Sequence, residues 1–233
     1  MERARFTADG RERSLLFVRL ARGRDVEVQL LPFLARKTAH VPAVFARGVP
    51  PPAVPAPLWV LVEDVWDAPS ACGADPGAIV AAKVAIERAV ARDAPALRAL
   101  GVATLPPEEI AERIAAVDPE AGARAREAAA RLSGWPAALA HGDLRCGSAR
   151  ETERGVVLVG WERAHVGCAL LDAVRLAADL VARGDAVLGI GLPRRYAEGV
   201  GRELGTDVLR GAEVLDRLSR RHLEGGVPGI WAR

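Results

Sequence analysis

Residues 139–172 read LAHGDLRCGSARETERGVVLVGWERAHVGCALLD, and this stretch says most about the fold. His141-Gly142-Asp143 is followed by an apolar run over 155–159, which is typical of a short buried strand, and then by Gly160-Trp161-Glu162. Nineteen positions separate His141 from Gly160, and the segment ends in Leu-Leu-Asp. The triplet alone is a weak signal, whereas the ordered run of all these pieces is a specific one.

This run resembles the catalytic loop of the aminoglycoside phosphotransferase and choline kinase-like family. The usual pattern of that family is His-Gly-Asp, four residues and an Asn, then an apolar strand that ends in Asp-Trp-Glu or Asp-Trp-Asp, then a Gly and a Leu-Asp pair. The resemblance implies an α+β, two-lobed protein kinase-like fold with a small β-containing N-lobe and a larger, mainly helical C-lobe. It also implies that Asp143 is the catalytic carboxylate that orients an attacking hydroxyl in phosphoryl transfer.

The magnesium ligands of the family are not kept in this sequence. The Asn and the Asp that hold the metal in the family are replaced by Ser148 and Gly160. Magnesium prefers carboxylate and amide oxygens, a serine hydroxyl is a weak ligand, and glycine offers no side chain. The sequence therefore predicts a degenerate magnesium site, and no metal ligand is assigned.

The small lobe carries the other residues that the resemblance places at a nucleotide site. Arg19 falls where the family has a lysine that grips the phosphates, and Glu27 lies where the family has the helix acid that pairs with it. Arginine keeps the charge but is a broader, more rigid fork than lysine. Glu63 ends LWVLVE, the strand that leads to the hinge where backbone groups of the family meet adenine.

The chain divides into three parts on composition and pattern. Residues 1–65 are expected to form a truncated N-lobe, 66–75 a connector, and 76–233 a helical C-lobe that contains the 139–172 segment. Asp9-Gly10 predicts a hairpin turn, and Leu58–Val62 gives the strongest strand signal. A helix is predicted from Asp25 to Ala35, with a kink or an early end at Pro32.

Helical patterns dominate the rest of the sequence. The stretch 76–100 is rich in alanine and leucine, and we expect Lys83, Glu87 and Arg88 to form its polar face. Capping and breaking signals predict further helices over 107–117, from 118 to about 133, and over 170–182, 196–203 and 208–222.

Composition limits the classes of function. Half of the residues are hydrophobic and 27% are charged, as in soluble globular proteins. With 32 basic and 30 acidic residues, the net charge gives no reason to expect a nucleic-acid or membrane partner. Three widely spaced cysteines (Cys72, Cys146 and Cys168) and an N-terminus without an apolar run indicate a cytoplasmic protein with free thiols.

Several residues around the predicted loop can have a structural role as well as a functional one. We expect His141 to brace the loop, Trp161 to lie in the core and Asp172 to tie the loop to the following helix. Arg145, Arg163 and His165 are either surface charges or fixed cations that replace the metal and form an anion pocket. Cys146 is interpreted as a small filling residue rather than a nucleophile.

Two functions fit these observations. The first is a pseudokinase-like binding or scaffolding component that works with a partner protein or peptide and binds ATP or GTP, if at all, with weak magnesium dependence. The second is an active phosphotransferase that moves the γ-phosphate of ATP or GTP to a hydroxyl of a small molecule or peptide, with Asp143 as base and Glu162 as substitute metal ligand. The missing acid at position 160 favours the first function.

Overall fold

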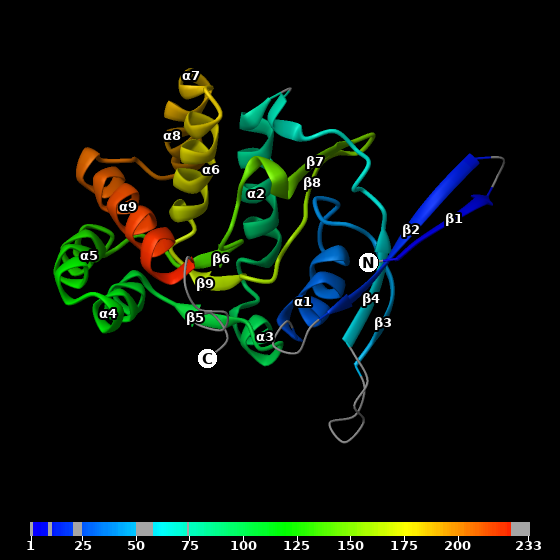
Figure 1. Cartoon of the computed structure of the whole chain (residues 1–233), viewed down its shortest axis with the longest axis horizontal. Helices are drawn as coiled ribbons and strands as arrows, with labels where there is room; N and C mark the ends of the chain where they lie inside the picture. The colour runs from blue at the N-terminus through cyan, green and yellow to red at the C-terminus, as the bar shows by residue number, and fades with distance from the viewer. Residues whose placement is uncertain (1, 9–10, 21–24, 50–57, 74, 225–233) are drawn as a thin grey trace.

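The computed structural model describes residues 2–8, 11–20, 25–49, 58–73 and 75–224, which form a small strand-bearing lobe and a larger helical lobe (Figure 1). The predicted α+β class and the two-lobed arrangement are confirmed. The segment expected to connect the lobes runs from the end of the small sheet to the first long helix. It contains a short 3-10 turn, η1 (Ala71–Gly73).

The small lobe is one antiparallel sheet covered by one helix. Strands β1 (Glu2–Ala8), β2 (Arg11–Leu20), β3 (Val44–Gly48) and β4 (Leu58–Glu63) pair in the order β1-β2-β4-β3. The predicted hairpin is confirmed by the pairing of β1 with β2, and its turn at 9–10 lies outside the described residues. Alternation along β2 buries Leu16 against Val28 of helix α1 (Asp25–Ala35), whereas Phe17 on the opposite face contacts Trp59.

Helix α1 passes through Pro32 without the early end that the sequence suggested. Proline has no N–H to donate to the carbonyl of Val28, four residues earlier. The guanidinium of Arg47 on β3 lies 3.5 Å from that oxygen and supplies a donor in its place. A side chain from the neighbouring sheet therefore compensates for the missing helical hydrogen bond.

The larger lobe contains the long helices and two small sheets. Its elements, in chain order, are α2 (Pro76–Val90), α3 (Ala94–Ala99), β5 (Ala103–Leu105), α4 (Pro107–Val117), α5 (Pro119–Arg131), β6 (Ala138–Ala140), η2 (Cys146–Ser148), β7 (Ala149–Thr152), β8 (Gly155–Leu158), β9 (His165–Gly167), α6 (Leu170–Ala182), α7 (Ala186–Ile190), α8 (Leu192–Gly199), α9 (Thr206–Ser219) and η3 (Arg220–Glu224). Strands β5, β9 and β6 form one sheet, and β7 pairs with β8. Helix α2 lies at the centre of the view, and α4, α5 and α9 group at the end of the molecule away from the small lobe (Figure 1).

The β7–β8 hairpin joins the two lobes through backbone and side-chain contacts. The Leu158 N–H donates to the carbonyl of His40 at 2.8 Å, and the Nδ1 atom of His40 lies 2.9 Å from the carbonyl of Val156. Arg154, at the hairpin turn, forms an ion pair with Glu63 at the end of β4. The strand that leads to Gly160 is thus bonded directly to the small lobe.

A disulfide joins Cys72 in η1 to Cys146 in η2, across a separation of 74 residues. The prediction of free thiols is therefore wrong for these two cysteines, and Cys168 is the buried free cysteine among the described residues. Disulfide pairing requires two Cα atoms to come within about 7 Å, which depends on the tertiary fold and which sequence spacing did not reveal. No helix in the described part of the chain is long and apolar enough to cross a bilayer.

Candidate functional site

The loop that follows β6 is organised around the buried ring of His141. The Nε2 atom of His141 lies 2.9 Å from the carbonyl of Val159, and Nδ1 accepts the Asp143 N–H at 3.3 Å. Trp161 is fully buried and contacts the same ring at a centroid distance of 4.7 Å. Burial lowers the pKa of His141, which suits a neutral ring that accepts at one nitrogen and donates at the other. His141 therefore braces the loop, as the sequence suggested.

Asp172, at the start of α6, holds the same loop from the other side. Its carboxylate accepts the His141 N–H at 2.6 Å and the Gly142 N–H at 2.9 Å. Gly142 has a φ of +84°, and a Cβ there would lie 2.2 Å from the carbonyl oxygen of Arg163, so only glycine fits. Asp172 thus ties the loop to the helix, and the Leu-Asp ending of the segment has a structural role.

A buried charged network lies behind this loop. The ammonium group of Lys83 on α2 donates to the carbonyl of Leu139 at 2.7 Å, forms an ion pair with Glu87 and lies 3.4 Å from Asp172. The hydroxyl of Tyr196 on α8 donates to Glu87 at 2.9 Å. The expectation that Lys83 and Glu87 form a polar face is therefore wrong, because both side chains are buried. Lys83 and Glu87 are four residues apart within an apolar run, and this spacing was the sequence signal that could have indicated a buried ion pair.

The charges of this network shift each other's pKa values. Burial raises the pKa of Glu87, and the nearby Lys83 only partly offsets it. Burial also pushes up the pKa of Asp172, but the charge of Lys83 and the hydrogen bond from the His141 N–H outweigh it. The pKa of Asp172 is therefore held below its ordinary value. Asp172 stays ionised and keeps its two backbone hydrogen bonds.

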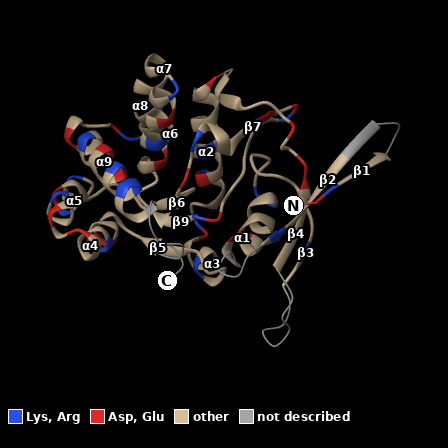
Figure 2. Cartoon of the chain, in the orientation of Figure 1, with Lys and Arg blue, Asp and Glu red and all other residues tan. Residues whose placement is uncertain are grey.

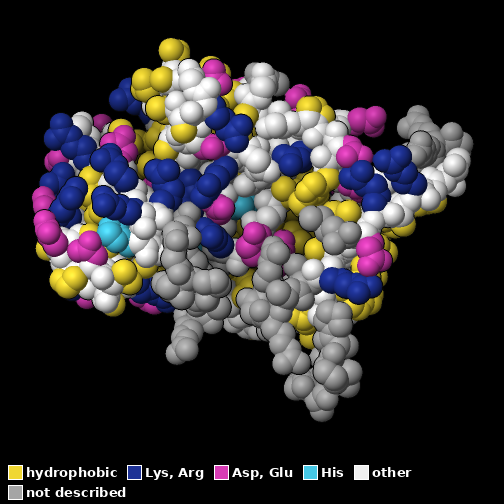
Figure 3. Space-filling model, viewed as in Figure 1, with side chains coloured by type: hydrophobic (Ala, Val, Ile, Leu, Met, Phe, Trp, Pro, Cys, Tyr) yellow, Lys and Arg dark blue, Asp and Glu magenta, His cyan; other side chains and the backbone are white. Residues whose placement is uncertain are grey.

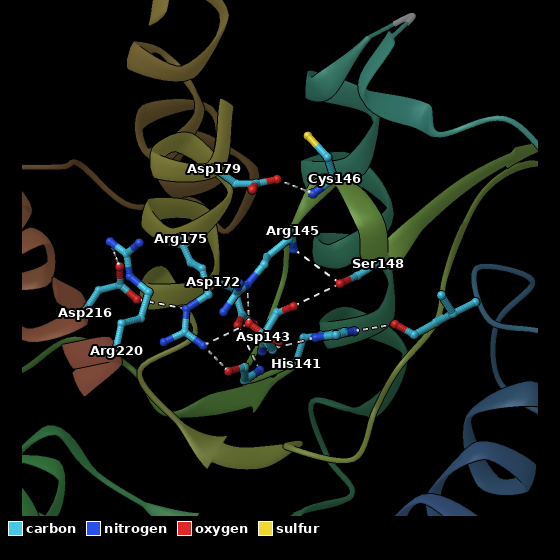
Figure 4. A network of polar contacts seen from close by, with 12 residues as sticks. His141, Asp143, Arg145, Cys146, Ser148, Asp172, Arg175, Asp179, Asp216 and Arg220 are labelled. Carbon is cyan, nitrogen blue, oxygen red and sulfur yellow. Dashed lines mark hydrogen bonds and ion pairs between the residues drawn. The ribbon is translucent and has the colours of Figure 1, made fainter. Parts of the chain in front are cut away.

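Asp143 lies between two guanidinium groups (Figure 4). Its Oδ1 atom accepts from Arg145 at 2.6 Å and lies 3.4 Å from Arg175 on α6, which also donates to the carbonyl of Gly142. The Asp143 side chain is 32% exposed, so it is neither a core residue nor freely hydrated. Arg175 was missed in the sequence, although it lies three residues after Asp172 on the same helical face.

Ser148 closes the loop on itself. Its hydroxyl donates to the backbone carbonyl of Asp143 at 2.9 Å and accepts the Arg145 N–H at 3.3 Å. The hydroxyl hydrogen and one of the two oxygen lone pairs of Ser148 are therefore used within the loop, which leaves one lone pair for any cation. The described residues contain no cluster of three or more His, Cys, Asp or Glu side chains arranged to hold a metal ion.

A cleft of about 230 Å³ lies between the lobes. Its lining comes from β2, α1, the segment before β3, β4, the connector and the segment that follows β8. The lining residues are Val18, Glu27, Leu31, Pro42, Val60, Val62, Trp66, Val159, Gly160 and Glu162. Gly160 has a φ of +82°, which favours glycine. The cleft is therefore mostly apolar, with Glu27 and Glu162 as its two carboxylates.

Two residues assigned to nucleotide binding lie elsewhere. The Arg19 side chain is 61% exposed and pairs with Glu2 at 3.0 Å, because strand alternation turns the preceding Val18 toward the cleft. Glu63 accepts the Ala43 N–H at 3.1 Å in addition to its ion pair with Arg154. Of the proposed nucleotide residues, the structure brings Glu27 into the cleft lining but not Arg19 or Glu63.

The two-lobed fold is similar to the folds of several solved kinases and phosphotransferases. An aminoglycoside phosphotransferase from Streptomyces rimosus, in complex with ADP and streptomycin, matches with a TM-score of 0.57 at 18% identity, over 89% of this chain and 86% of that chain. Amicoumacin kinase, in complex with AMP-PNP, Ca²⁺ and Ami, matches with a TM-score of 0.61 at 12% identity, over 98% of this chain and 81% of that chain.

A choline/ethanolamine kinase family protein from Mesorhizobium loti matches with a TM-score of 0.58 at 16% identity, over 92% of this chain and 76% of that chain. At these identities the likeness establishes the fold. The chain has the kinase-like fold of aminoglycoside phosphotransferases and choline/ethanolamine kinases, as its catalytic-loop resemblance implied. Neither a protein-family model nor a curated protein matches the sequence.

Proposed function

We propose that this chain is a pseudokinase-like protein that binds a nucleotide in the cleft between its lobes with little dependence on magnesium. In this proposal it acts as a binding or scaffolding component for a partner protein or peptide. The observation that carries the proposal is Gly160, which lines the cleft where the related catalytic loops have an aspartate. Without that carboxylate, a metal–triphosphate complex loses its main electrostatic anchor.

The surroundings of Asp143 support the same proposal. A general base must reach the proton of the attacking hydroxyl, but Arg145 and Arg175 both approach the same oxygen of Asp143. These ion pairs stabilise the negative charge and compete with a substrate hydroxyl for the carboxylate. Ser148 is similarly occupied within the loop.

The direct test is a calorimetric titration of the protein with ATP and with GTP, in the presence and absence of magnesium. We expect weak binding that magnesium tightens by less than about tenfold, which corresponds to ~1.4 kcal/mol. Val18→Trp should fill the apolar cleft and abolish this binding. Arg19→Trp is the matched control, because its side chain is next along β2 and exposed. Equal loss in both variants, or no binding by the wild type, would contradict the proposal.

An active phosphotransferase is the second candidate, favoured by the presence of Glu27 and Glu162 in the lining of one cleft with Gly160. Two carboxylates can together hold a magnesium ion, and transfer would go to a hydroxyl of a small molecule or peptide. If magnesium tightened ATP binding by much more than tenfold, and if Glu162→Gln and Glu27→Gln each removed this effect, the results would support this candidate instead.

A further inference from the structure

We propose that the disulfide between Cys72 and Cys146 is a redox switch, at which exchange with a dithiol frees the connector from the loop that follows Asp143. Cys72 lies in η1, near the end of the connector, and Cys146 begins η2, three residues after Asp143. The bond thus joins the segment between the lobes directly to this loop. Because Trp66 of the connector lines the cleft, release of the connector changes one wall of the cleft.

The Cys146 half of the disulfide is fixed in the larger lobe. Cys146 is 1% exposed, and its N–H donates to the carboxylate of Asp179 on α6 at 2.9 Å (Figure 4). Ser148, at the other end of η2, donates to the Asp143 carbonyl and accepts the Arg145 N–H. None of these contacts involves a sulfur atom, so Cys146 keeps its place when the disulfide is broken.

The Cys72 half is held less firmly. Cys72 is partly exposed in a turn of three residues, of which the preceding alanine has a buried side chain. Hydrogen bonds also link this part of the connector to the larger lobe: the Ser70 hydroxyl donates to the Cys146 carbonyl at 3.0 Å, and the Glu151 N–H donates to the Pro69 carbonyl at 2.8 Å. A hydrogen bond or a buried methyl group contributes little on its own, so the covalent bond is the strongest restraint on the turn.

The connector is anchored at its other end to the small lobe. Arg3 on β1 donates to Asp64 at 3.2 Å and to Asp67 at 3.0 Å. Figures 2 and 3 show basic and acidic residues next to one another where β1 reaches the connector. Trp66 lies between these two aspartates in the chain, so the segment that carries it is held by the small lobe at one end and through Cys72 by the larger lobe at the other. Reduction frees the second end.

The exchange is a two-electron reaction that needs a dithiol as the reductant. A thiolate of the dithiol attacks Sγ of Cys72, the more accessible of the two cysteines, and the S–S bond breaks with Cys146 as the leaving thiolate. The second thiol of the reagent then attacks the mixed disulfide and displaces Cys72. The dithiol becomes a disulfide and loses two protons and two electrons, and the protein gains two thiols.

A disulfide with only a structural role predicts a different result. Its reduction would lower the free energy of unfolding and leave the connector of the folded protein unchanged. The state of the connector must therefore be measured in the folded protein, separately from stability.

The test is acrylamide quenching of tryptophan fluorescence in the folded whole chain, before and after treatment with dithiothreitol. Subtraction of the Trp66→Phe signal isolates Trp66, and subtraction of the Trp59→Phe signal isolates a matched tryptophan on β4, outside the connector. We expect reduction to raise the quenching constant of Trp66 by about twofold or more, because the freed connector opens locally, and to leave that of Trp59 unchanged. Cys72→Ser should show the higher value with and without dithiothreitol, whereas Cys168→Ser should respond as the wild type does.

The reactivity of single thiols tests which sulfur is attacked. With Cys168 replaced by serine in both variants, Cys146→Ser leaves Cys72 as the single thiol, and Cys72→Ser leaves Cys146. We expect cystamine to form a mixed disulfide with Cys72 at least about ten times faster than with Cys146, because access limits exchange at a buried sulfur.

Three results overturn the inference: unfolding of the chain on reduction, an unchanged quenching constant of Trp66, or reaction of Cys146 as fast as that of Cys72. The effect on a ligand rests on the proposed function: the reduced chain should bind ATP more weakly, by about threefold or more, because the wall of the cleft is no longer preorganised. Absence of ATP binding in both redox states, with the response of Trp66 intact, would remove the proposed function and leave the switch standing.

Discussion

The ammonium group of Lys83 lies 3.4 Å from the carboxylate of Asp172, and both side chains are buried behind the loop of His141 and Asp143. Helix α2 and helix α6 are thereby joined by a charge pair in the interior. The pair also fixes Asp172 where it accepts two backbone N–H groups of the loop. The geometry of the loop thus depends on a lysine 58 to 60 positions earlier in the chain.

Lys83→Met should destabilise the protein by about 3–5 kcal/mol, because it leaves the Glu87 and Asp172 carboxylates buried without their cation. Urea unfolding measures this change. Lys37→Met is the matched control: Lys37 pairs with Asp93 at 2.8 Å with both side chains partly exposed, so about 1 kcal/mol or less is expected. Similar costs for the two variants would show that the buried network contributes no more than a surface pair.

Stability should fall in two stages as the pH is lowered. Burial lowers the pKa of His141 and of His165, so protonation favours the unfolded chain, and their contribution is lost as the pH falls below about 6.5. The pKa of Asp172 is also lowered, so its contribution is complete above about 4 and is lost below that. Urea midpoints between pH 7 and pH 3 test both stages.

Asp172→Asn separates the two stages of acid unfolding. The variant should be less stable at pH 7 and should lose less stability below about pH 4 than the wild type, because the Asp172 contribution is gone, while the decrease between pH 7 and pH 5 persists. An unchanged slope below pH 4 would mean that other carboxylates control acid unfolding.

Cys72→Ser should lower the free energy of unfolding by about 4 kcal/mol, the loop-closure value for a disulfide that spans 74 residues. Treatment of the wild type with a dithiol should have a similar effect, and the variant should no longer respond to it. Cys168→Ser, at the free cysteine, should be equally sensitive to the dithiol as the wild type. A wild type whose unfolding is indifferent to reductant would contradict the pairing of Cys72 with Cys146.

Gly160→Asp combined with Ser148→Asn should increase the magnesium dependence of ATP binding, because a carboxylate and an amide oxygen would again be available to a metal. A Cβ at Gly160 would meet Glu162 at 3.4 Å, which is ordinary contact, but the φ of +82° adds strain of about 1 kcal/mol. Gly160→Asn with Ser148→Asn has a similar shape without the charge and is the control. Equal magnesium effects in the two folded variants would refute the lost-metal-site explanation.

The sequence predicted the elements whose patterns are local and long. Helices over 107–117 and 170–182 and the hairpin around Asp9-Gly10 follow from capping, spacing and turn residues, and the structure has them. Strands β5, β6 and β9 were missed because each has three residues, too few to show a period of two. Their existence depends on pairing between segments far apart in the chain.

In the site, too, the features that are local in the sequence were predicted, and those that depend on contacts between distant segments were not. The loop from His141 to Ser148 was recognised from its order of residues. The partners that fix its chemistry, Lys83, Arg175 and Asp216, come from three different helices. A charged residue in an apolar helix suggests burial, but the sequence alone does not say which opposite charge it will meet.

The bonds between His40 and the β7–β8 hairpin have a consequence for how the cleft admits a ligand. The Leu158 N–H donates to the carbonyl of His40, and Leu158 lies only two residues before Gly160 in the cleft lining. A backbone hydrogen bond therefore connects this part of the larger lobe to the small lobe. Rocking the lobes apart would break that bond together with the ion pair of Arg154 and Glu63. These contacts oppose a widening of the cleft, so we expect a ligand to enter it with little rotation of one lobe against the other.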